Sequence, residues 1–170
     1  MFKNEALELA SLHTIQNLVF TPVSRLYLYV LLVNNSVQYL VLCLLLFIAN
    51  YWRFEPFMLY QSQIIMVLVL YVLLHSTVSI LAFKRRKYAL RTYDISFKSG
   101  VIVSSLTTVP LSRIQHLDIS QGIASRFFGL ANVKLYTAGD DGSDMVIKGL
   151  LLTEAEQLKE HLSVQINERF

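Results

Sequence analysis

The chain has 170 residues, of which 54% are hydrophobic and 16% are charged, and its mean hydropathy is +0.48. Ordinary soluble domains are about 45–50% apolar and about 25% charged, so this composition argues against a wholly soluble protein. The single cysteine, Cys43, excludes a disulfide scaffold or a multi-thiolate zinc site within one chain. The net charge of +3 is small, and no nucleic-acid partner is expected.

Residues 1–25 precede the apolar part of the chain and are predicted to form a cytoplasmic or interfacial segment. The spacing of apolar residues in positions 1–23 favours a short amphipathic helix that Pro22 ends or kinks, with a frayed tail as the alternative. Lys3, Glu5 and Glu8 near the start argue against a cleaved signal peptide.

Two long uncharged stretches supply most of the apolar character. Residues 26–52 contain no Asp, Glu, Lys or Arg over 27 positions, and residues 56–83 contain none over 28. About 20 mainly apolar helical residues cross a bilayer core, so each stretch has room for one span. We predict a transmembrane hairpin over residues 26–83, with spans at about residues 33–52 and 63–83. The alternative is that the two stretches are helices of a soluble protein's core. A helix at the surface of a soluble protein has a polar face toward water, and neither stretch has one.

The ends of the hairpin carry polar and basic residues. The polar group Asn34–Gln38 is expected near one interface, so that residues 26–32 lie at headgroup level or extend the helix. Arg53 is the only basic residue between the spans, and residues 53–61 are predicted to be a short external loop. Five basic residues follow the second span closely: Lys84, Arg85, Arg86, Lys87 and Arg91. By the positive-inside rule, both ends of the hairpin therefore face the cytoplasm. The cluster serves as a topology anchor or, alternatively, as a surface for anionic lipid, where each cation contributes about 1 kcal/mol.

Residues 84–170 have the character of a small soluble domain. They contain 12 Lys and Arg, 9 Asp and Glu, and all six glycines of the chain. Apolar and polar residues alternate with period two between frequent turns, which is typical of a β-rich domain. Strands are predicted at residues 88–91, 94–99, 101–109, 114–121, 131–137 and 144–149, with a helical turn at 123–128 and a helix at 154–167.

The last helix is expected to begin with a capping box formed by Thr153 and Glu156. Leu158, Leu162 and Ile166 repeat every four residues and should form its packed face. A helix that covers the open end of a curled antiparallel sheet protects its edges. The predicted fold is two transmembrane helices followed by a mainly β domain, a bent antiparallel split barrel capped by a C-terminal helix.

Several short motifs of this domain occur in a distinctive order and spacing. They are Tyr88-x-Leu90-x-x-Tyr93-Asp94-Ile95, Ser99-Gly100, Val109-Pro110-Leu111-x-Arg113-Ile114-Gln115, Gln121-Gly122, Arg126-Phe127-Phe128-Gly129-Leu130-Ala131, Thr137-Ala138-Gly139 and Ile147-x-Gly149-Leu150. In this order they resemble the bacterial pleckstrin-homology (PH) domain of the YdbS-like membrane protein family, which also places two spans ahead of one such domain.

The resemblance implies a PH-like fold over residues 84–170. Together with the orientation expected from the basic residues, it leads us to expect a location in the bacterial inner membrane with both termini cytoplasmic. It implies little about activity, because a fold does not determine a function. PH domains elsewhere bind phosphoinositides or proteins. A chain with its own spans does not need lipid binding for attachment, which favours a protein partner, such as a second PH-like membrane protein, or a homo-oligomer.

No constellation of residues predicts catalysis, a cofactor or a metal. The four histidines lack metal-ligand spacing, and Cys43 lies in mid-span as a small apolar residue. His75, in the second span, is expected to bond to a neighbouring serine or a helix carbonyl, with a proton-relay role as the alternative. The acidic turn Asp140–Asp144 lacks the length and the closing Glu of an EF-hand and is expected to be a solvated hairpin turn.

The residues with the best prospect of forming a binding surface are Arg113, Gln115, Gln121 and Arg126. Forked hydrogen bonds from Arg113 and Arg126 suit a phosphate or a carboxylate, although the same groups also suit loop carbonyls of the fold. The sequence predicts a non-enzymatic binding or assembly module at the cytoplasmic face of the membrane. Recognition of anionic lipid headgroups is one alternative, and an accessory subunit of a transport or envelope-stress system is another.

Overall fold

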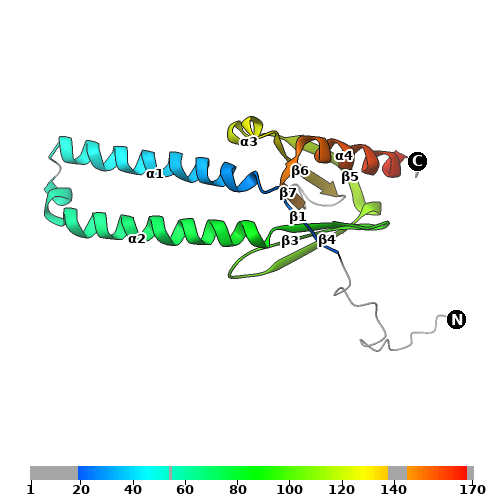
Figure 1. The fold of residues 1–170 in the computed structure, drawn as a ribbon, viewed down its shortest axis with the longest axis horizontal. Coiled ribbons are helices and arrows are strands. Elements are labelled where there is room, and N and C mark those ends of the chain that lie inside the picture. Colours follow the sequence, from blue (N-terminus) through cyan, green and yellow to red (C-terminus); the bar gives the residue numbers. More distant parts are fainter. Residues whose placement is uncertain (1–18, 54, 138–144, 168–170) are drawn as a thin grey trace, which may run out of the picture.

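A computed structural model describes residues 19–53, 55–137 and 145–167 of the chain (Figure 1). The predictions made for residues 1–18 and for the acidic turn at residues 140–144 lie outside these ranges. A long helical hairpin extends from one side of a smaller domain built of strands and helices.

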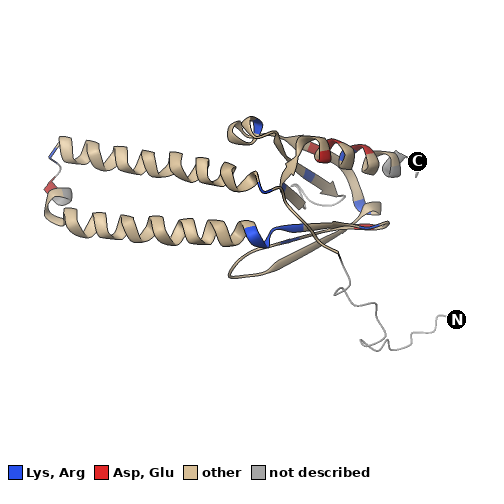
Figure 2. Cartoon of the chain, viewed as in Figure 1, with Lys and Arg blue, Asp and Glu red and all other residues tan. Residues whose placement is uncertain are grey.

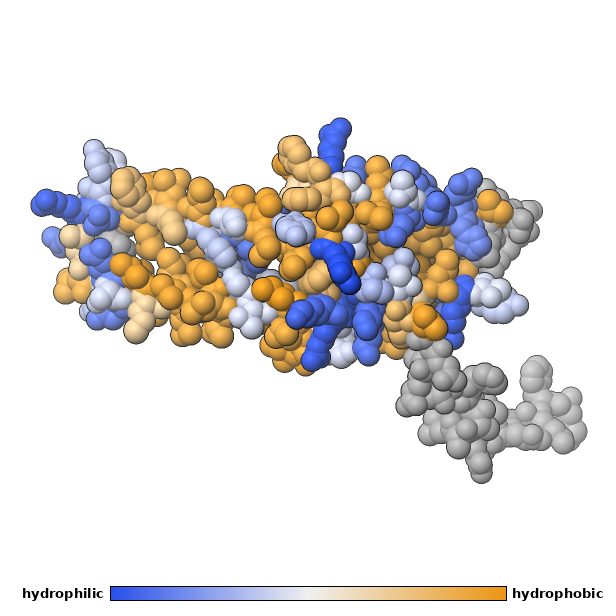
Figure 3. Space-filling model, viewed as in Figure 1, coloured by the Kyte–Doolittle hydropathy of each residue, from blue (hydrophilic) through white to orange (hydrophobic). Residues whose placement is uncertain are grey.

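The hairpin consists of α1 (Tyr27–Tyr51) and α2 (Glu55–Arg85). Both helices are long and apolar enough to cross a membrane, and their most apolar windows are not buried by the rest of the chain. Figure 3 shows this surface as mainly orange, with paler and blue side chains among the orange toward the domain. α1 begins at Tyr27, six residues before the predicted first span.

The connection between the two helices is shorter than the predicted loop. α2 already begins at Glu55, whose carboxylate favours the positive end of a helix. Tyr60 has non-helical backbone angles, φ −116° and ψ 19°, so the helix is kinked there. At the other end, Lys84 and Arg85 occupy the last turn, where cations offset the negative end of the helix dipole.

The hairpin is inserted between the first two strands of a four-stranded antiparallel sheet. The strands are β1 (Thr21–Pro22), β2 (Lys87–Leu90), β3 (Asp94–Ser99) and β4 (Ser105–Pro110), in that spatial order. In the β1–β2 pair, Thr21 lies opposite Tyr88 and Pro22 opposite Lys87. The sheet therefore begins before the spans rather than at residue 84, and no periodicity could reveal a strand of two residues.

β4 begins at Ser105, so the prediction of a strand from residue 101 is wrong. Gly100 has φ +102°, a conformation that side chains rarely adopt, and a Cβ there would meet the carbonyl oxygen of Val103. Residues 100–104 therefore form a tight turn between β3 and β4 rather than the start of a strand.

A second antiparallel sheet contains β5 (Ile114–Ser120), β6 (Leu130–Thr137) and β7 (Met145–Leu151), in sequence order. A 3-10 turn, η3 (Leu111–Arg113), links the two sheets, and the short helix α3 (Ile123–Phe127) links β5 to β6. The C-terminal helix α4 (Leu152–Asn167) follows β7 directly. The expected fold class is confirmed, although within the described residues the two sheets stay separate rather than closing into one barrel.

The domain core lies between the two sheets and α4. Its members are large apolar side chains that are buried or nearly so, including Ile95, Leu135, Ile147, Leu150 and Leu162. Leu158 and Leu162 of α4 belong to this core, as predicted from their spacing.

A second apolar cluster joins the hairpin to the domain. It contains Val23 from the segment before α1, Tyr27 and Val30 from the start of α1, and Leu130 from β6. Next to it, β7 has a bulge at Gly149, whose carbonyl accepts a hydrogen bond of 3.0 Å from the Ser24 N–H. The spanning helices are therefore packed against the domain at their base, and are not joined to it by a free linker.

Candidate anion-binding site beside the second spanning helix

The basic cluster that follows the second span divides between a helix and a strand. Lys84 and Arg85 are in the last turn of α2, and Lys87 is the first residue of β2. In Figure 2 these residues form the blue band where α2 meets the domain.

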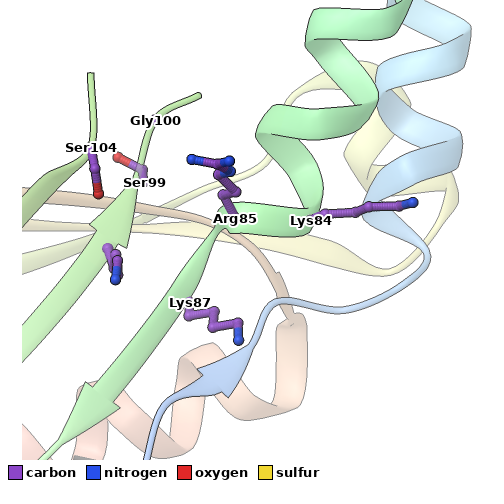
Figure 4. Close-up of a pocket in the computed structure, with 7 residues that line it drawn as sticks. Lys84, Arg85, Lys87, Ser99, Gly100 and Ser104 are labelled. Atoms are coloured by element: carbon purple, nitrogen blue, oxygen red, sulfur yellow. The ribbon is translucent and has the colours of Figure 1, made fainter. Parts of the chain in front are cut away.

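A hollow of about 280 Å³ lies between this cluster and the β3–β4 turn. Its lining contains four cations, two hydroxyls and one glycine: Lys84, Arg85, Lys87, Lys98, Ser99, Gly100 and Ser104. Figure 4 shows the Arg85 side chain extending toward Ser99 and Ser104, whereas Lys84 extends away from the turn. Arg85 Nη1 donates a hydrogen bond of 3.3 Å to the Val101 carbonyl, which holds the turn beside the helix.

Two lysines of this site face each other across the sheet. Lys87 and Lys98 are direct partners in the antiparallel β2–β3 register, and both are exposed. Side chains of direct partners are on one face of the sheet with their Cβ atoms about 5 Å apart, and like charges in that position are destabilising. None of the seven lining residues is acidic. An anion bound between the two lysines would remove this repulsion, and serine hydroxyls nearby can donate to its oxygens.

Arg86 is directed elsewhere. Its guanidinium lies over the Tyr27 ring, 5.2 Å from the ring centroid, where it packs against the start of α1. Its Nη1 atom is buried and has no hydrogen-bond partner within the described residues. Arg86 therefore belongs to the junction between hairpin and domain and is absent from the lining of the hollow.

Arg91 is separated from the rest of the basic cluster by the length of β2, about 13 Å. Its Nε lies 2.7 Å from Asp94 Oδ1, an ion pair that closes the β2–β3 turn at the far end of the domain.

The structure does not bring the four predicted surface residues together. Arg113 and Gln115 are exposed near the start of β5, whereas Gln121 and Arg126 follow its other end, about 20 Å away. Gln121 Nε2 donates a 2.8 Å hydrogen bond to the Leu130 carbonyl and so supports the loop before α3. Arg126 is exposed on α3, between Ile123 and Phe127.

Lys98, Ser99 and Ser104 line the hollow but were not predicted from the sequence. Lys98 is eleven positions from Lys87 in the chain and approaches it only because β2 and β3 form a hairpin. The alternation of the two strands, joined by a turn at residues 91–93, could have predicted the pairing of Lys87 with Lys98.

A polar cluster lies inside the spanning hairpin. The Tyr39 hydroxyl is 2.9 Å from both His75 Nδ1 and Ser76 Oγ, and the Tyr71 ring stacks on the His75 ring. His75 thus meets a tyrosine of the other helix rather than a serine of its own. Gln38 Nε2 donates a 2.8 Å hydrogen bond to the Tyr71 hydroxyl. No group of three or more candidate metal-ligating side chains occurs in the part of the chain that the structure describes.

The profile of the family described as "Bacterial PH domain" matches residues 26–166, which is most of the chain. The protein therefore belongs to the bacterial PH domain family, and it is a membrane protein with two transmembrane helices.

Two curated relatives are transmembrane proteins of Bacillus subtilis (strain 168). YdbS is 35% identical over 77 residues, which cover 45% of this chain and 46% of YdbS. YdbT is 27% identical over 83 residues, which cover 48% of this chain and 17% of YdbT. The chain thus spans less than half of the length of either relative. A solved protein with a pleckstrin-homology domain, from Shewanella loihica PV-4, is 16% identical to this chain with a TM-score of 0.40. The match covers 49% of this chain and 73% of the Shewanella chain.

Proposed function

We propose that the protein is a non-catalytic binding module held at the cytoplasmic face of the membrane, and that its hollow beside α2 binds the phosphate headgroups of anionic lipids. The observation that carries this proposal is the Lys87–Lys98 pair, two like charges placed directly opposite each other in a hollow with no acidic lining. Anionic lipid was the alternative expected from the sequence, and the basic lining of the hollow supports it.

The position of the hollow supports a lipid rather than a soluble anion. Lys84 and Arg85 follow directly after the uncharged stretch that ends at Phe83. Cations at that depth lie among the headgroups, where each contributes about 1 kcal/mol of attraction to an anionic leaflet. A phosphate that approaches between Lys87 and Lys98 would also meet the Arg85 fork, which suits phosphate geometry.

Native mass spectrometry of the whole chain in neutral detergent, titrated with phosphatidylglycerol or phosphatidylcholine, tests the proposal. We expect the wild type to retain phosphatidylglycerol in preference to phosphatidylcholine. The double variant Lys87→Gln/Lys98→Gln should bind phosphatidylglycerol about thirty-fold more weakly, since it loses two cations at about 1 kcal/mol each. Equal retention of the two lipids by the wild type would refute the proposal.

Lys159→Gln, an exposed lysine of α4, is the matched control and should leave lipid preference unchanged. In neutral detergent the double variant should be at least as stable as the wild type, because it removes like-charge repulsion. A loss of stability there would show that the two lysines serve the fold instead.

Assembly through the spanning hairpin is a second candidate function, favoured by one observation. Gln38 and Tyr71 are exposed in the middle of the hairpin and border a hollow of about 560 Å³ between the helices that is otherwise lined by apolar side chains. Polar side chains within a bilayer usually face protein rather than lipid, so a helix of a second copy would cover this pair.

Photobleaching steps of the labelled chain in liposomes at decreasing surface density would measure this association. We expect dimers that Gln38→Leu weakens by about five- to thirty-fold, the value of one or two kcal/mol for a polar contact between membrane helices. Ser36→Ala, at an exposed position of α1 outside the hollow, should have no effect. A wild type that is monomeric at every density would exclude this role.

A further inference from the structure

The domain has two apolar tips on its surface. On α3, Ile123 and Phe127 are 84% and 85% exposed and, being four residues apart, lie on one side of the helix. In the β3–β4 turn, Ile102 and Val103 are 90% and 78% exposed. Side chains of this size are rarely left so exposed in pairs on a soluble domain without a binding role.

Both tips are on the side of the domain from which the spanning helices leave (Figure 1). α3 packs against the start of α1, where the rings of Phe128 and Tyr29 stack with centroids 6.0 Å apart. The β3–β4 turn is held at the end of α2 by the Arg85–Val101 hydrogen bond. One tip therefore flanks each helix at the base of the hairpin.

The length of α1 places this base in the headgroup layer. Its 25 residues extend over about 37 Å, whereas the hydrocarbon core is about 30 Å thick and takes about 20 residues. Tyr51 and Trp52 mark the other interface, as aromatic residues commonly do. Counted back from Tyr51, the hydrocarbon ends near Leu32, so Tyr29 and the helix packed on it lie at the boundary between headgroups and acyl chains.

We propose that the domain lies directly on its own membrane, with Ile123 and Phe127 on one side of the hairpin and Ile102 and Val103 on the other inserted into the leaflet. Apolar side chains of interfacial proteins reach about 5–10 Å into this boundary. The cation Arg126 lies between the two apolar residues of α3, in position to meet headgroups. Insertion goes beyond the proposed headgroup site, because apolar contact requires no anionic lipid.

With both tips in the leaflet, only part of the domain surface remains accessible to a soluble partner. The β2–β3 turn and η3, joined by the Leu111 N–H to Tyr93 carbonyl hydrogen bond, lie at the opposite end of the domain and face water. Any soluble partner of the domain would then bind at that end or on α4.

Spin labels on the whole chain in nanodiscs test the insertion. In a Cys43→Ser background, which removes the single cysteine, labels are attached through Ile102→Cys, Phe127→Cys or, as a control on η3, Ser112→Cys. We expect oxygen to relax the labels at positions 102 and 127 more strongly than a water-soluble nickel complex does, and the reverse at position 112.

The measurement is made in phosphatidylcholine alone and in a mixture with phosphatidylglycerol. Insertion should persist in phosphatidylcholine, so a failure of the headgroup site leaves this result unchanged. Nickel access at positions 102 and 127 would overturn the proposal. Labels that are shielded from both relaxants would overturn it as well, because they would indicate that another copy of the chain covers the tips.

Discussion

Gly149 shows how one residue joins the hairpin to the domain. It has φ +85°, and a Cβ atom there would lie 2.5 Å from Cγ of Tyr27, whose ring occupies the space beside the β7 bulge. The absence of a side chain therefore allows α1 to pack against the sheet.

We expect Gly149→Ala to lower the free energy of unfolding of the domain by about 2–4 kcal/mol, from backbone strain and overpacking together. Pulse proteolysis in urea, on the whole chain in neutral detergent, would measure the change. Gly122→Ala is the control, because nothing lies within 4 Å of a Cβ at that position and its backbone angles are ordinary. Equal midpoints for the two variants would contradict this account.

We expect Tyr88 to make the stability of the domain depend on pH in the alkaline range. Burial raises the pKa of Tyr88 above its ordinary value of 10.0, and the negative charge of Glu154 raises this pKa further. A pKa that is higher in the folded state contributes stability below pH 10, and this contribution is lost as the pH rises through the folded-state pKa.

Tyr88→Phe should therefore flatten the loss of stability above pH 10, as measured by urea midpoints between pH 8 and pH 11. Tyr93→Phe, at a position that is 77% exposed, should leave the slope as in the wild type. A Tyr88→Phe variant with the wild-type slope would show that other groups control the alkaline transition.

At the scale of elements, α4 begins differently from the prediction. The helix starts at Leu152, and Glu154 Oε2 accepts a 3.2 Å hydrogen bond from the Leu151 N–H. The predicted capping box paired Thr153 with Glu156, two residues too late. β7 continues to Leu151, with Leu150 buried in the core, and α4 follows at once, so the residues predicted as a connection are divided between the strand and the first turn of the helix.

Replacing Glu154 with Ala should cost about 0.5–1 kcal/mol of domain stability, the value of a lost contact at a helix N-terminus. Glu156→Ala removes the same charge two residues along, at an exposed position, and should be close to neutral by the same urea measurement. If Glu156→Ala were the more costly change, the predicted box would be correct after all.

For the whole molecule, orientation is the property on which the proposals about the cytoplasmic face depend. The basic residues around the end of α2 outnumber the single arginine between the spans, so the domain should face the cytoplasm. A reporter that is active only in the cytoplasm, fused after Phe170, should be active. A periplasm-specific reporter at the same place should be silent, and the opposite pattern would reverse the topology.

Much of the architecture followed from the sequence because it depends on local patterns. Uncharged stretches long enough for a bilayer predicted two spans, and they correspond to α1 and α2. Alternation predicted β3 with its bounds as observed and most of the other strands to within a few residues. Leu158 and Leu162 were placed on the buried face of the last helix by their spacing alone. Such patterns can be recognised in the sequence because each one repeats within a few residues.

The tertiary structure alone decided which residues gather beside the end of the second spanning helix. Lys98, Ser99 and Ser104 join the basic cluster only through the β2–β3 hairpin and the turn that follows it, whereas Arg91 leaves the cluster because β2 carries it away. β1 pairs with a strand that comes after both spans, and its two residues lie 67 and 65 positions from their partners Tyr88 and Lys87. Composition and periodicity indicate which residues of one segment are buried. They do not indicate which distant segments come into contact, because that depends on how the segments pack against each other.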